Sequence, residues 1–387
     1  MGFPGLRDKK SGGDMIYLDY AANTPAAKEV LDCYYEEGMR VLANPNSKHQ
    51  LGKQSKDRLE QITAGIASLL RVKPTEIIYT SGASEANNLA IKGLALSNSQ
   101  RGKHIISTCL EHPSVSGALT YLQAQGFEID LVDLTSDGLV DLDHLQELLR
   151  KDTILVSICA VDSELGVRQQ LAELAEILKN YPDCRFHTDA TQAVGKINIS
   201  MEEADCITLA PHKFYGLNSS GLLIKKENLV LEPLIHGGSS TTLYRSGTPD
   251  VAMAAATYKA LELALGNLEQ RFVYISRLKE QLERELSGYK KVRLNSTRFS
   301  IPHILNVSVQ GIKAVQFTQS LEEKGICVSV KSACSVLNTP SRPVYAVTRD
   351  KKNAMCSWRV SLSHLTTEEE LQSFLEAFDQ CYRSLAE

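Results

Sequence analysis

Short runs of β-branched residues alternate with helical patterns through the middle of the chain, and this alternation restricts the fold more than any other feature. The runs begin at residue 76 and read EIIYT, KHIIST, FEIDLVDL, TILVSICAV, CRFHTD and DCITLA, with helical segments such as EANNLAIKGLAL between them. Strands separated by helices pair in parallel, because each helix carries the chain back across one face of the sheet. We therefore predict a large α/β domain built on a mainly parallel sheet.

The rest of the chain predicts one odd strand and a second, smaller domain. GLLIKK follows DCITLA after a glycine-containing turn, so we expect it to pair nearby as the odd strand of the sheet. A long helical stretch from about 250 to 287 leads to HILNVSV, ICVSV and WRVSLS and to an amphipathic helix from Thr367, which indicate an α+β domain. We expect a flexible extension over 1–14, a large domain over 15–260 whose first residues can contribute to the small domain, and a small domain over 261–387 that carries Cys334.

Charge, hydropathy and cysteine usage narrow the partners and the compartment. The 387 residues have a formal net charge of -4, which provides no basic field for nucleic acid or for an anionic membrane surface. No apolar run approaches the roughly 20 residues that cross a bilayer. The nine cysteines are scattered, with no CxxC pair and no Cys/His cluster at zinc spacing, so we predict no metal site and a reducing, cytoplasmic compartment. Small molecules and proteins are the expected partners.

Polar residues at the carboxyl ends of the predicted strands are the first candidates for a site, because open parallel sheets bind ligands there. TSGASEAN follows EIIY and opens a helix, so Ala83 and Ser84 offer backbone N–H groups and a hydroxyl at a helix N-terminus. Such a terminus suits a phosphate group. The alternative is a plain capping box with no ligand.

Asp189 and Lys213 end two successive strand-like runs and should therefore reach the same crevice. A carboxylate buried at Asp189 needs a cationic or hydrogen-bonding partner, and the protonated pyridine nitrogen of an aromatic cofactor is one. The alternatives are an N-capping Asp and a solvated loop lysine. Their coincidence favours a cofactor lysine at position 213.

Two further residues have side chains suited to catalysis. His112 follows KHIIST, where an imidazole could stack on a cofactor ring or carry protons, although a histidine before proline is also a common loop residue. Cys334 lies in VKSACSVLNTPSRP, a polar segment that predicts an exposed loop. An exposed thiol is a candidate nucleophile, and an incidental surface cysteine is the alternative.

Taken in order, these segments resemble the cysteine desulfurase family, the NifS/IscS-like enzymes of the class V aminotransferase group, which use pyridoxal 5′-phosphate (PLP). The resemblance runs from YLDYAANTP near residue 17 to RVSLSHLTTEEE near residue 370, and its other segments are NPNSKHQLGK, TSGASEANNLAIKG, EHPSV, ELGVRQ, HTDATQAVGK, HKFYG, RSGTPD and SAC. It implies the PLP-dependent transferase fold type I, with a mainly parallel, seven-stranded type of sheet in the large domain and a smaller α+β domain.

The resemblance also implies roles at the cofactor ring. Lys213 would be the Schiff-base lysine, and Asp189 would contact the pyridine nitrogen. Gln192 would contact the ring hydroxyl, and His112 would stack on the ring and assist proton transfer.

By the same resemblance, the phosphate would lie against Ala83, Ser84 and His212, with Thr248 reaching in from the second subunit of a homodimer. Arg359, at the end of a strand, would clamp the substrate carboxylate with its planar guanidinium.

Cys334 would then accept the sulfur of L-cysteine as a persulfide, with release of L-alanine. The sulfur would pass to an iron–sulfur scaffold or to another protein acceptor.

Four places depart from the family pattern, one of them the segment GGSSTTLY before RSGT, which lacks the usual Glu-Arg-Gly. Asp162 stands where the family has an asparagine near the ring hydroxyl and substrate carboxylate; an ionised Asp162 could accept a hydrogen bond there but would repel that carboxylate. Ala210 removes one phosphate-binding hydroxyl, and Lys331 replaces the glycine before Ser-Ala-Cys. These departures leave two alternatives open: a related PLP-dependent lyase or aminotransferase for another amino acid, and a weakly active paralogue that acts as a binding partner.

Overall fold

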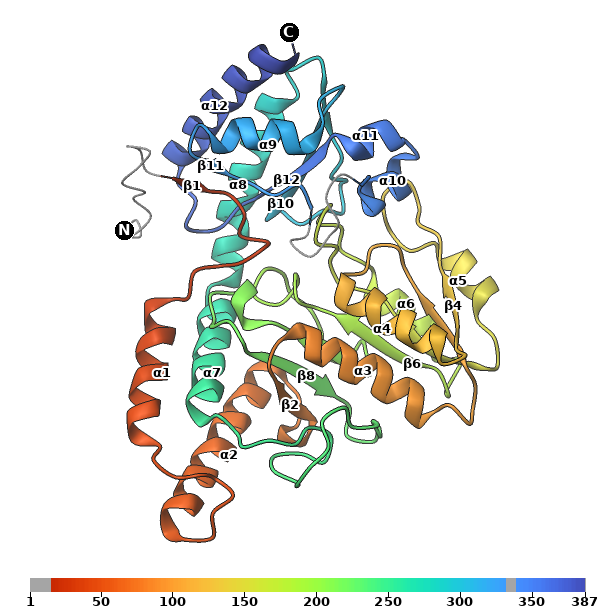
Figure 1. Ribbon diagram of the computed structural model, residues 1–387, viewed down its shortest axis with the longest axis vertical. Coiled ribbons are helices and arrows are strands. Elements are labelled where there is room, and N and C mark those ends of the chain that lie inside the picture. The colour runs from red at the N-terminus through yellow and green to blue at the C-terminus, as the bar shows by residue number, and fades with distance from the viewer. Residues whose placement is uncertain (1–14, 332–338, 387) are drawn as a thin grey trace.

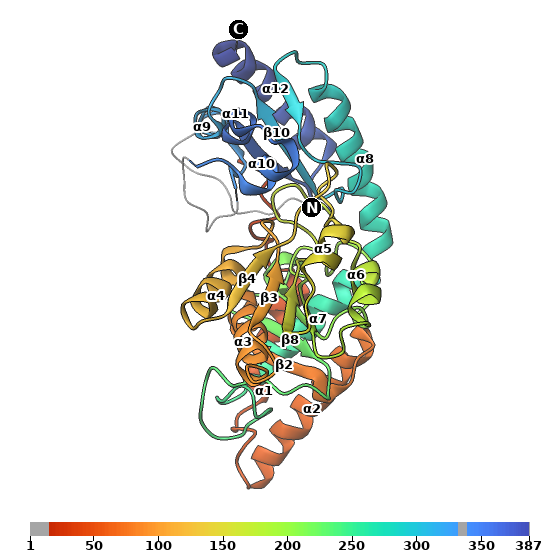
Figure 2. The ribbon, with the colours of Figure 1, turned by 90° about the vertical axis from the view of Figure 1, so that its right-hand side faces the viewer.

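The computed structural model describes residues 15–331 and 339–386 (Figure 1). The predicted extension over 1–14 and the predicted nucleophile Cys334 lie outside the described residues. Two domains follow one another along the long axis of the molecule, with the C-terminal helix at one end and the central sheet in the other half (Figures 1 and 2).

The large domain contains a seven-stranded sheet in the order β2-β8-β7-β6-β5-β3-β4. All neighbouring strands pair in parallel except β8, which is antiparallel to both β2 and β7. Only a short connection with one 3-10 turn separates β7 from β8, too short for a crossover helix. The predicted mainly parallel sheet and its odd strand are thus confirmed. The strands are β2 (Ile77–Thr80), β3 (His104–Ser107), β4 (Glu128–Leu131), β5 (Thr153–Ser157), β6 (Arg185–Asp189), β7 (Cys206–Leu209) and β8 (Gly221–Lys225).

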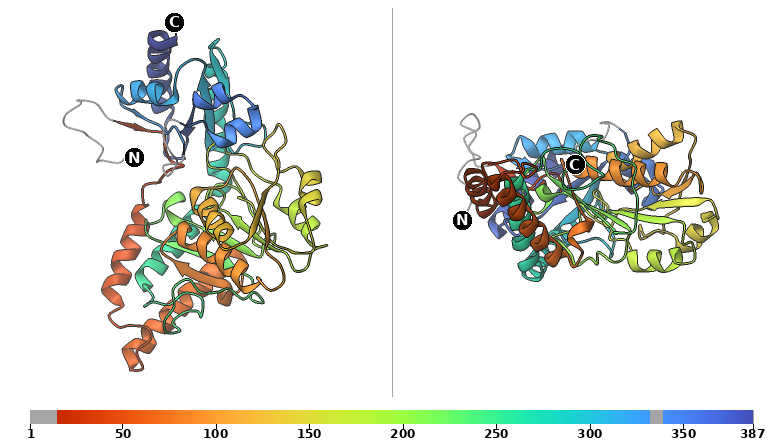
Figure 3. Two further views of the ribbon diagram at one scale, coloured as in Figure 1. Left: turned by 45° about the vertical axis from the view of Figure 1, so that its right-hand side comes forward. Right: turned by 90° about the horizontal axis from the view of Figure 1, so that it is seen from below.

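Helices cover both faces of this sheet, which explains why its strands, apart from β4, are almost entirely buried. Successive strand residues point to opposite faces: Ile105 packs with α3 and α4, whereas Ile106 packs in the cluster that contains α2, α6 and α7. α1 and α2 pack against α7 at one side of the domain (Figure 3). The helices are α1 (Lys28–Arg40), α2 (Gln50–Leu70), α3 (Ala83–Ser97), α4 (Pro113–Ala124), α5 (Leu142–Leu148), α6 (Leu171–Leu178), α7 (Val251–Gly266), and the 3-10 turns η1 (Pro74–Glu76) and η2 (Pro211–Lys213).

The small domain is built around an antiparallel sheet in the order β12-β10-β9. An aromatic group that includes Phe317, Trp358 and Phe374 fills its core. Of the predicted strand ICVSV, only the first two residues form a strand, β11, and this pairs in parallel with β1. The elements are β1 (Ile16–Tyr17), β9 (Val292–Leu294), β10 (Ile304–Val309), β11 (Ile326–Cys327), β12 (Ser357–Ser361), α8 (Leu268–Leu286), α9 (Ala314–Glu322), α10 (Arg342–Thr348), α11 (Lys351–Met355) and α12 (Glu368–Ala386).

The stretch expected to be one long helix is two helices that meet at Asn267, whose backbone is not helical (φ -117°, ψ 12°). Buried residues of α7 as far as Ala264 belong to the core of the large domain, whereas Ile275 of α8 belongs to the small-domain core. The change from one core to the other falls at Asn267, and we propose the domain boundary there, close to the predicted boundary at residue 260. No helix within 15–331 or 339–386 combines the length and the apolar character needed to cross a membrane.

Candidate active site

A cavity of about 400 Å³ lies at the carboxyl ends of the central strands, where the large domain meets β12 of the small domain. Eight residues predicted from five separate segments line this one cavity: Ala83, Ser84, His112, Asp189, Gln192, His212, Lys213 and Arg359. Two other predicted site residues, Asp162 and Thr248, do not line it. The fold therefore brings together most of the predicted site.

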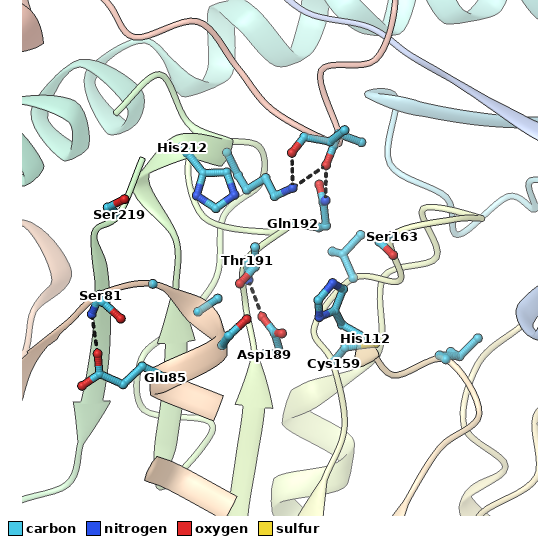
Figure 4. A pocket seen from close by; sticks show the side chains of 18 of the residues that line it. Ser81, Glu85, His112, Cys159, Ser163, Asp189, Thr191, Gln192, His212 and Ser219 are labelled. Carbon is cyan, nitrogen blue, oxygen red and sulfur yellow. Dashed lines mark hydrogen bonds between the residues drawn. The ribbon is translucent and has the colours of Figure 1, made fainter. Parts of the chain in front are cut away.

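Lys213 lies in η2, directly after β7, and its ammonium group points across the cavity toward the N-terminal segment. Its Nζ donates hydrogen bonds to the carbonyl oxygens of Ala21, at 2.8 Å, and Ala22, at 2.5 Å (Figure 4). Burial and the neighbouring Lys213 lower the pKa of His212 to about 4, so this imidazole is neutral at physiological pH. The two backbone carbonyls that accept from Lys213 are neutral groups as well.

Residues 15–24, which we call the N-terminal strap, connect the small domain to this lysine. The strap begins as β1 beside β11, and the Ala21 amide donates to Ser361 Oγ at 2.9 Å. Further along, the amide and the hydroxyl of Thr24 each donate to the His212 carbonyl at 2.9 Å. Sequence reasoning assigned no role to the strap, although YLDYAANTP was among the matching segments.

Asp189 ends β6 and is 7% exposed, so its carboxylate needs partners. Oδ2 accepts from Asn87 Nδ2 at 2.8 Å, and Oδ1 accepts from the Thr191 amide at 2.9 Å. Both donors are neutral and leave the carboxylate charge uncompensated, which suits a cationic group in the cavity. Gln192 lines the same cavity, and its Nε2 donates to the Ala21 carbonyl at 2.8 Å (Figure 4).

The opposite end of the cavity has the features of an anion site. Gly82 has φ 154° and ψ 175°, a backbone conformation that glycine alone adopts readily, and it starts α3 without a side-chain cap. The N-terminus of α3 therefore offers backbone N–H groups and the positive end of its dipole. The hydroxyl residues Ser81 and Ser219 lie at this end, away from His112 (Figure 4). Ser219 was not foreseen from the sequence, and it adds a hydroxyl to a cavity in which Ala210 provides none.

Arg359 is 1% exposed on β12, and its charge is already paired. Nη2 donates to Asp19 Oδ1 at 2.7 Å and Nη1 donates to the Ser163 carbonyl at 2.6 Å. Nε has no partner among the described residues. Asp19 belongs to the N-terminal strap, so this segment holds the arginine as well as the lysine.

Asp162 is placed differently from the prediction that it faces the ring and the substrate. Its Oδ2 accepts from the backbone amides of Leu165, at 2.5 Å, and Glu164, at 3.2 Å, so the side chain turns into its own loop. Burial, with the nearby Glu164 carboxyl, raises the pKa of Asp162 to about 7. The expected repulsion of the substrate by a fully ionised Asp162 is therefore not supported, because two amides capture the carboxyl and burial favours its neutral form.

This arrangement predicts that Asp162 lowers the stability of the fold in a pH-dependent way. A carboxyl whose pKa is raised in the folded protein favours folding when protonated, so stability falls as the pH rises from about 4 toward 7. Asp162→Asn keeps an acceptor for the two amides and carries no charge. We expect the variant to melt higher than the natural protein at pH 8, by about 2 °C or more, with the difference vanishing near pH 4. Thermal unfolding at pH 4–8 measures this, and a pH-independent difference would contradict it.

The comparisons with known proteins agree with this geometry. Residues 16–374 match the family described as aminotransferase class-V. A protein named cysteine desulfurase IscS from Dictyoglomus turgidum is 36% identical over 375 residues, which cover 96% of this chain and 95% of that protein. A NifS/IcsS protein homolog from Lactobacillus delbrueckii subsp. bulgaricus is 35% identical over 95% of this chain and 97% of that protein.

Among solved structures, one titled NifS-like protein superposes with a TM-score of 0.90 at 30% identity, covering 96% of this chain and 100% of that chain. This likeness confirms the predicted fold type. Together with the motifs that meet in the cavity, it shows that the chain belongs to the class-V aminotransferase family, in the branch of the IscS and NifS cysteine desulfurases.

Proposed function

We propose that this protein is a PLP-dependent cysteine desulfurase that takes sulfur from L-cysteine onto Cys334 as a persulfide and releases L-alanine. The observation that carries the proposal is the meeting of Lys213, Asp189 and Arg359 in one cavity. An amine, a carboxylate for a pyridinium and a guanidinium for a substrate carboxylate are the groups that such a reaction needs.

The cavity fits PLP in size and in polarity. Its volume of about 400 Å³ suits a small cofactor together with an amino acid. Ser81, Ser84 and Ser219, with the α3 N-terminus, would hold the phosphate, while Asp189 and His112 would hold the ring. When bound, PLP supplies an electron sink for the bonds at the substrate α-carbon.

The protein's own residues would orient the substrate and move its protons. Arg359 would bind the substrate carboxylate through the guanidinium hydrogens not used by its present partners. Lys213 Nζ, once free, would take the α-proton and return a proton to the product, with His112 beside it. The Cys334 thiolate would attack the substrate sulfur, forming an S–S bond while the C–S electrons pass to carbon. That carbon then gains a proton, so alanine leaves.

A second cavity of about 730 Å³ supports access of Cys334 to the substrate. It shares Leu110, His112 and Ser163 with the first cavity. It is also lined by Lys331 and Thr339, which flank the segment that carries Cys334. Lys331 Nζ donates to Thr339 Oγ1 at 2.8 Å, so the two ends of that segment are tied together beside the active site.

A cysteine substitution tests the persulfide step. We expect Cys334→Ser to keep the visible absorbance of bound PLP and to lose alanine release from L-cysteine. Cys109→Ser is the matched control, because this thiol lines the second cavity but burial raises its pKa to about 11, which makes it a poor nucleophile. Alanine release that survives in Cys334→Ser would overturn the persulfide step and favour a PLP-dependent lyase instead.

We further propose that the protein is a homodimer that buries one face of α1. Leu31, Tyr35 and Met39 follow one another at four-residue spacing and are 49%, 69% and 73% exposed, with Leu42, which is 87% exposed, just beyond the helix. An apolar stripe of this size on one helix typically marks an interface. Thr248 is exposed and outside its own chain's cavity, which agrees with a role in the partner's site.

The dimer proposal predicts a change in assembly. Leu31→Glu combined with Met39→Glu should give monomers in sedimentation equilibrium and weaken PLP retention on dialysis, since the partner's phosphate contact is lost. Val273→Glu is the control, because Val273 is 66% exposed on α8, a helix that is not part of this stripe. A double variant that stays dimeric would contradict the assignment of α1 to the interface.

A further inference from the structure

A chain of hydrogen bonds joins Asp189 to His112, two residues that line the cavity, and none of the roles described above uses its two middle members. Asn87 of α3 is fully buried, and its Nδ2 donates both to Asp189 Oδ2, at 2.8 Å, and to Ser114 Oγ, at 2.9 Å. Ser114 Oγ lies 2.8 Å from His112 Nδ1. We call Asn87 and Ser114 the amide–hydroxyl bridge.

The chemistry of the groups determines the direction of every bond in this bridge. An ionised carboxylate only accepts hydrogen bonds, so the NH₂ group of Asn87 must face Asp189. The backbone amide of Ser114 donates to His112 Nδ1, at 3.1 Å, which makes Nδ1 an acceptor. Ser114 Oγ accepts from the NH₂ group of Asn87 and therefore uses its own proton for the bond to Nδ1. Two donors therefore converge on one ring nitrogen.

We propose that Asn87 and Ser114 are positioning residues that hold His112 as the neutral tautomer with its proton on Nε2. Nδ1 then keeps its lone pair for the two Ser114 donors, and Nε2 is the ring nitrogen left to exchange a proton in the cavity. The proposal for the ring stands by itself, while its catalytic consequence rests on the desulfurase function proposed above.

The bridge orients the imidazole but does not conduct protons to it. An amide NH₂ donates to both of its neighbours and accepts no proton from either, so Asn87 interrupts any proton path from Asp189. Protonation of His112 at Nδ1 would set the new proton against the Ser114 backbone N–H and would force the Ser114 hydroxyl to turn from donor to acceptor. This opposes the cation in the same direction as burial, which lowers the pKa of His112.

Nitrogen NMR of the purified full-length protein with ¹⁵N-labelled histidine tests the tautomer directly. The signals are assigned with His112→Gln. We expect the natural protein to show the Nε2–H form at pH 7–8. Ser114→Ala removes the hydroxyl donor and should reduce the ratio of the Nε2–H to the Nδ1–H form about two- to tenfold, the effect of one neutral hydrogen bond.

Matched variants separate positioning from general damage to α4. Ser114→Thr keeps a hydroxyl and should restore the tautomer ratio, whereas Thr120→Ala removes a hydroxyl of the same helix that bonds only to a backbone carbonyl. Asn87→Leu should act like Ser114→Ala. In both weakened variants the acid limb of the kcat/KM profile should move to higher pH, because His112 becomes easier to protonate.

The outcomes distinguish this inference from the proposed function. An Nδ1–H tautomer in the natural protein, or a ratio unaffected by Ser114→Ala, would overturn the bridge whatever the enzyme does. The expected NMR result in a protein that releases no alanine would instead overturn the desulfurase function and leave the bridge standing.

Discussion

Replacing Lys213 with arginine should abolish covalent attachment of PLP and lower alanine release from L-cysteine by roughly a thousandfold or more. Arginine keeps a cation for the carbonyls of Ala21 and Ala22, which accept from the natural lysine. Its guanidinium cannot form the carbon–nitrogen double bond that holds the cofactor, and at pH 7 it has no free base to take a proton. The fold should therefore survive while the chemistry is lost.

Borohydride reduction followed by peptide mass spectrometry measures this result directly. The natural protein should carry the reduced cofactor on the peptide that contains Lys213, and Lys213→Arg should carry none. Lys225→Arg is the matched control, since Lys225 likewise donates to a backbone carbonyl, that of Leu229 at 2.7 Å, but lies outside the cavity. Cofactor found on another lysine of the natural protein would refute the assignment.

Replacing Arg359 with lysine should raise KM for L-cysteine by about 10- to 100-fold, with a smaller change in kcat. The guanidinium already serves Asp19 and the Ser163 carbonyl, and its planar fork has donors left for a third acceptor. A lysine ammonium placed at Asp19 cannot serve all three. Steady-state kinetics with varied L-cysteine distinguish this effect from a loss of turnover.

Alanine at this position should act on stability as well. Arg359→Ala leaves the Asp19 carboxylate without its cation in a mostly buried setting, and removing one partner of such a pair costs about 3 kcal/mol.

For the kinetic experiment with Arg359→Lys, the matched control is Arg293→Lys, because Arg293 lies on β9 of the same small-domain sheet and is 42% exposed. An unchanged KM for L-cysteine in Arg359→Lys would remove Arg359 from the substrate site.

The cavity explains why strand ends were informative in this sequence. Asp189 and Lys213 follow neighbouring parallel strands, and the carboxyl ends of parallel strands lie on one edge of a sheet. Two residues far apart in the chain could therefore be assigned to one crevice before any coordinates were known. His112 follows the end of β3 on the same edge, so the same reasoning reached it.

Hydrogen-bond and ion-pair partners that are distant in the sequence could not be found by this reasoning. Asp19 pairs with Arg359 across 340 positions, and Asn87 bonds to Asp189 across 102 positions. Asp19 lies in YLDYAANTP and Asn87 in TSGASEAN, two segments that matched the family. No local periodicity, however, indicates which side chain a buried polar group will contact. Asp162 is a case in which the sequence suggested the wrong partner. We expected its charge to face the substrate, but its carboxylate accepts hydrogen bonds from two backbone amides of its own loop.

The sequence by itself determined the sheet, its odd strand, the family and most residues of the cavity, because hydrophobic periods and strand-end motifs act over short stretches of chain. The tertiary structure alone decided the break at Asn267, the strap that holds Lys213 and Arg359, and the bridge that orients His112. These depend on contacts between distant segments, where burial makes each polar group take whichever partner the packing supplies.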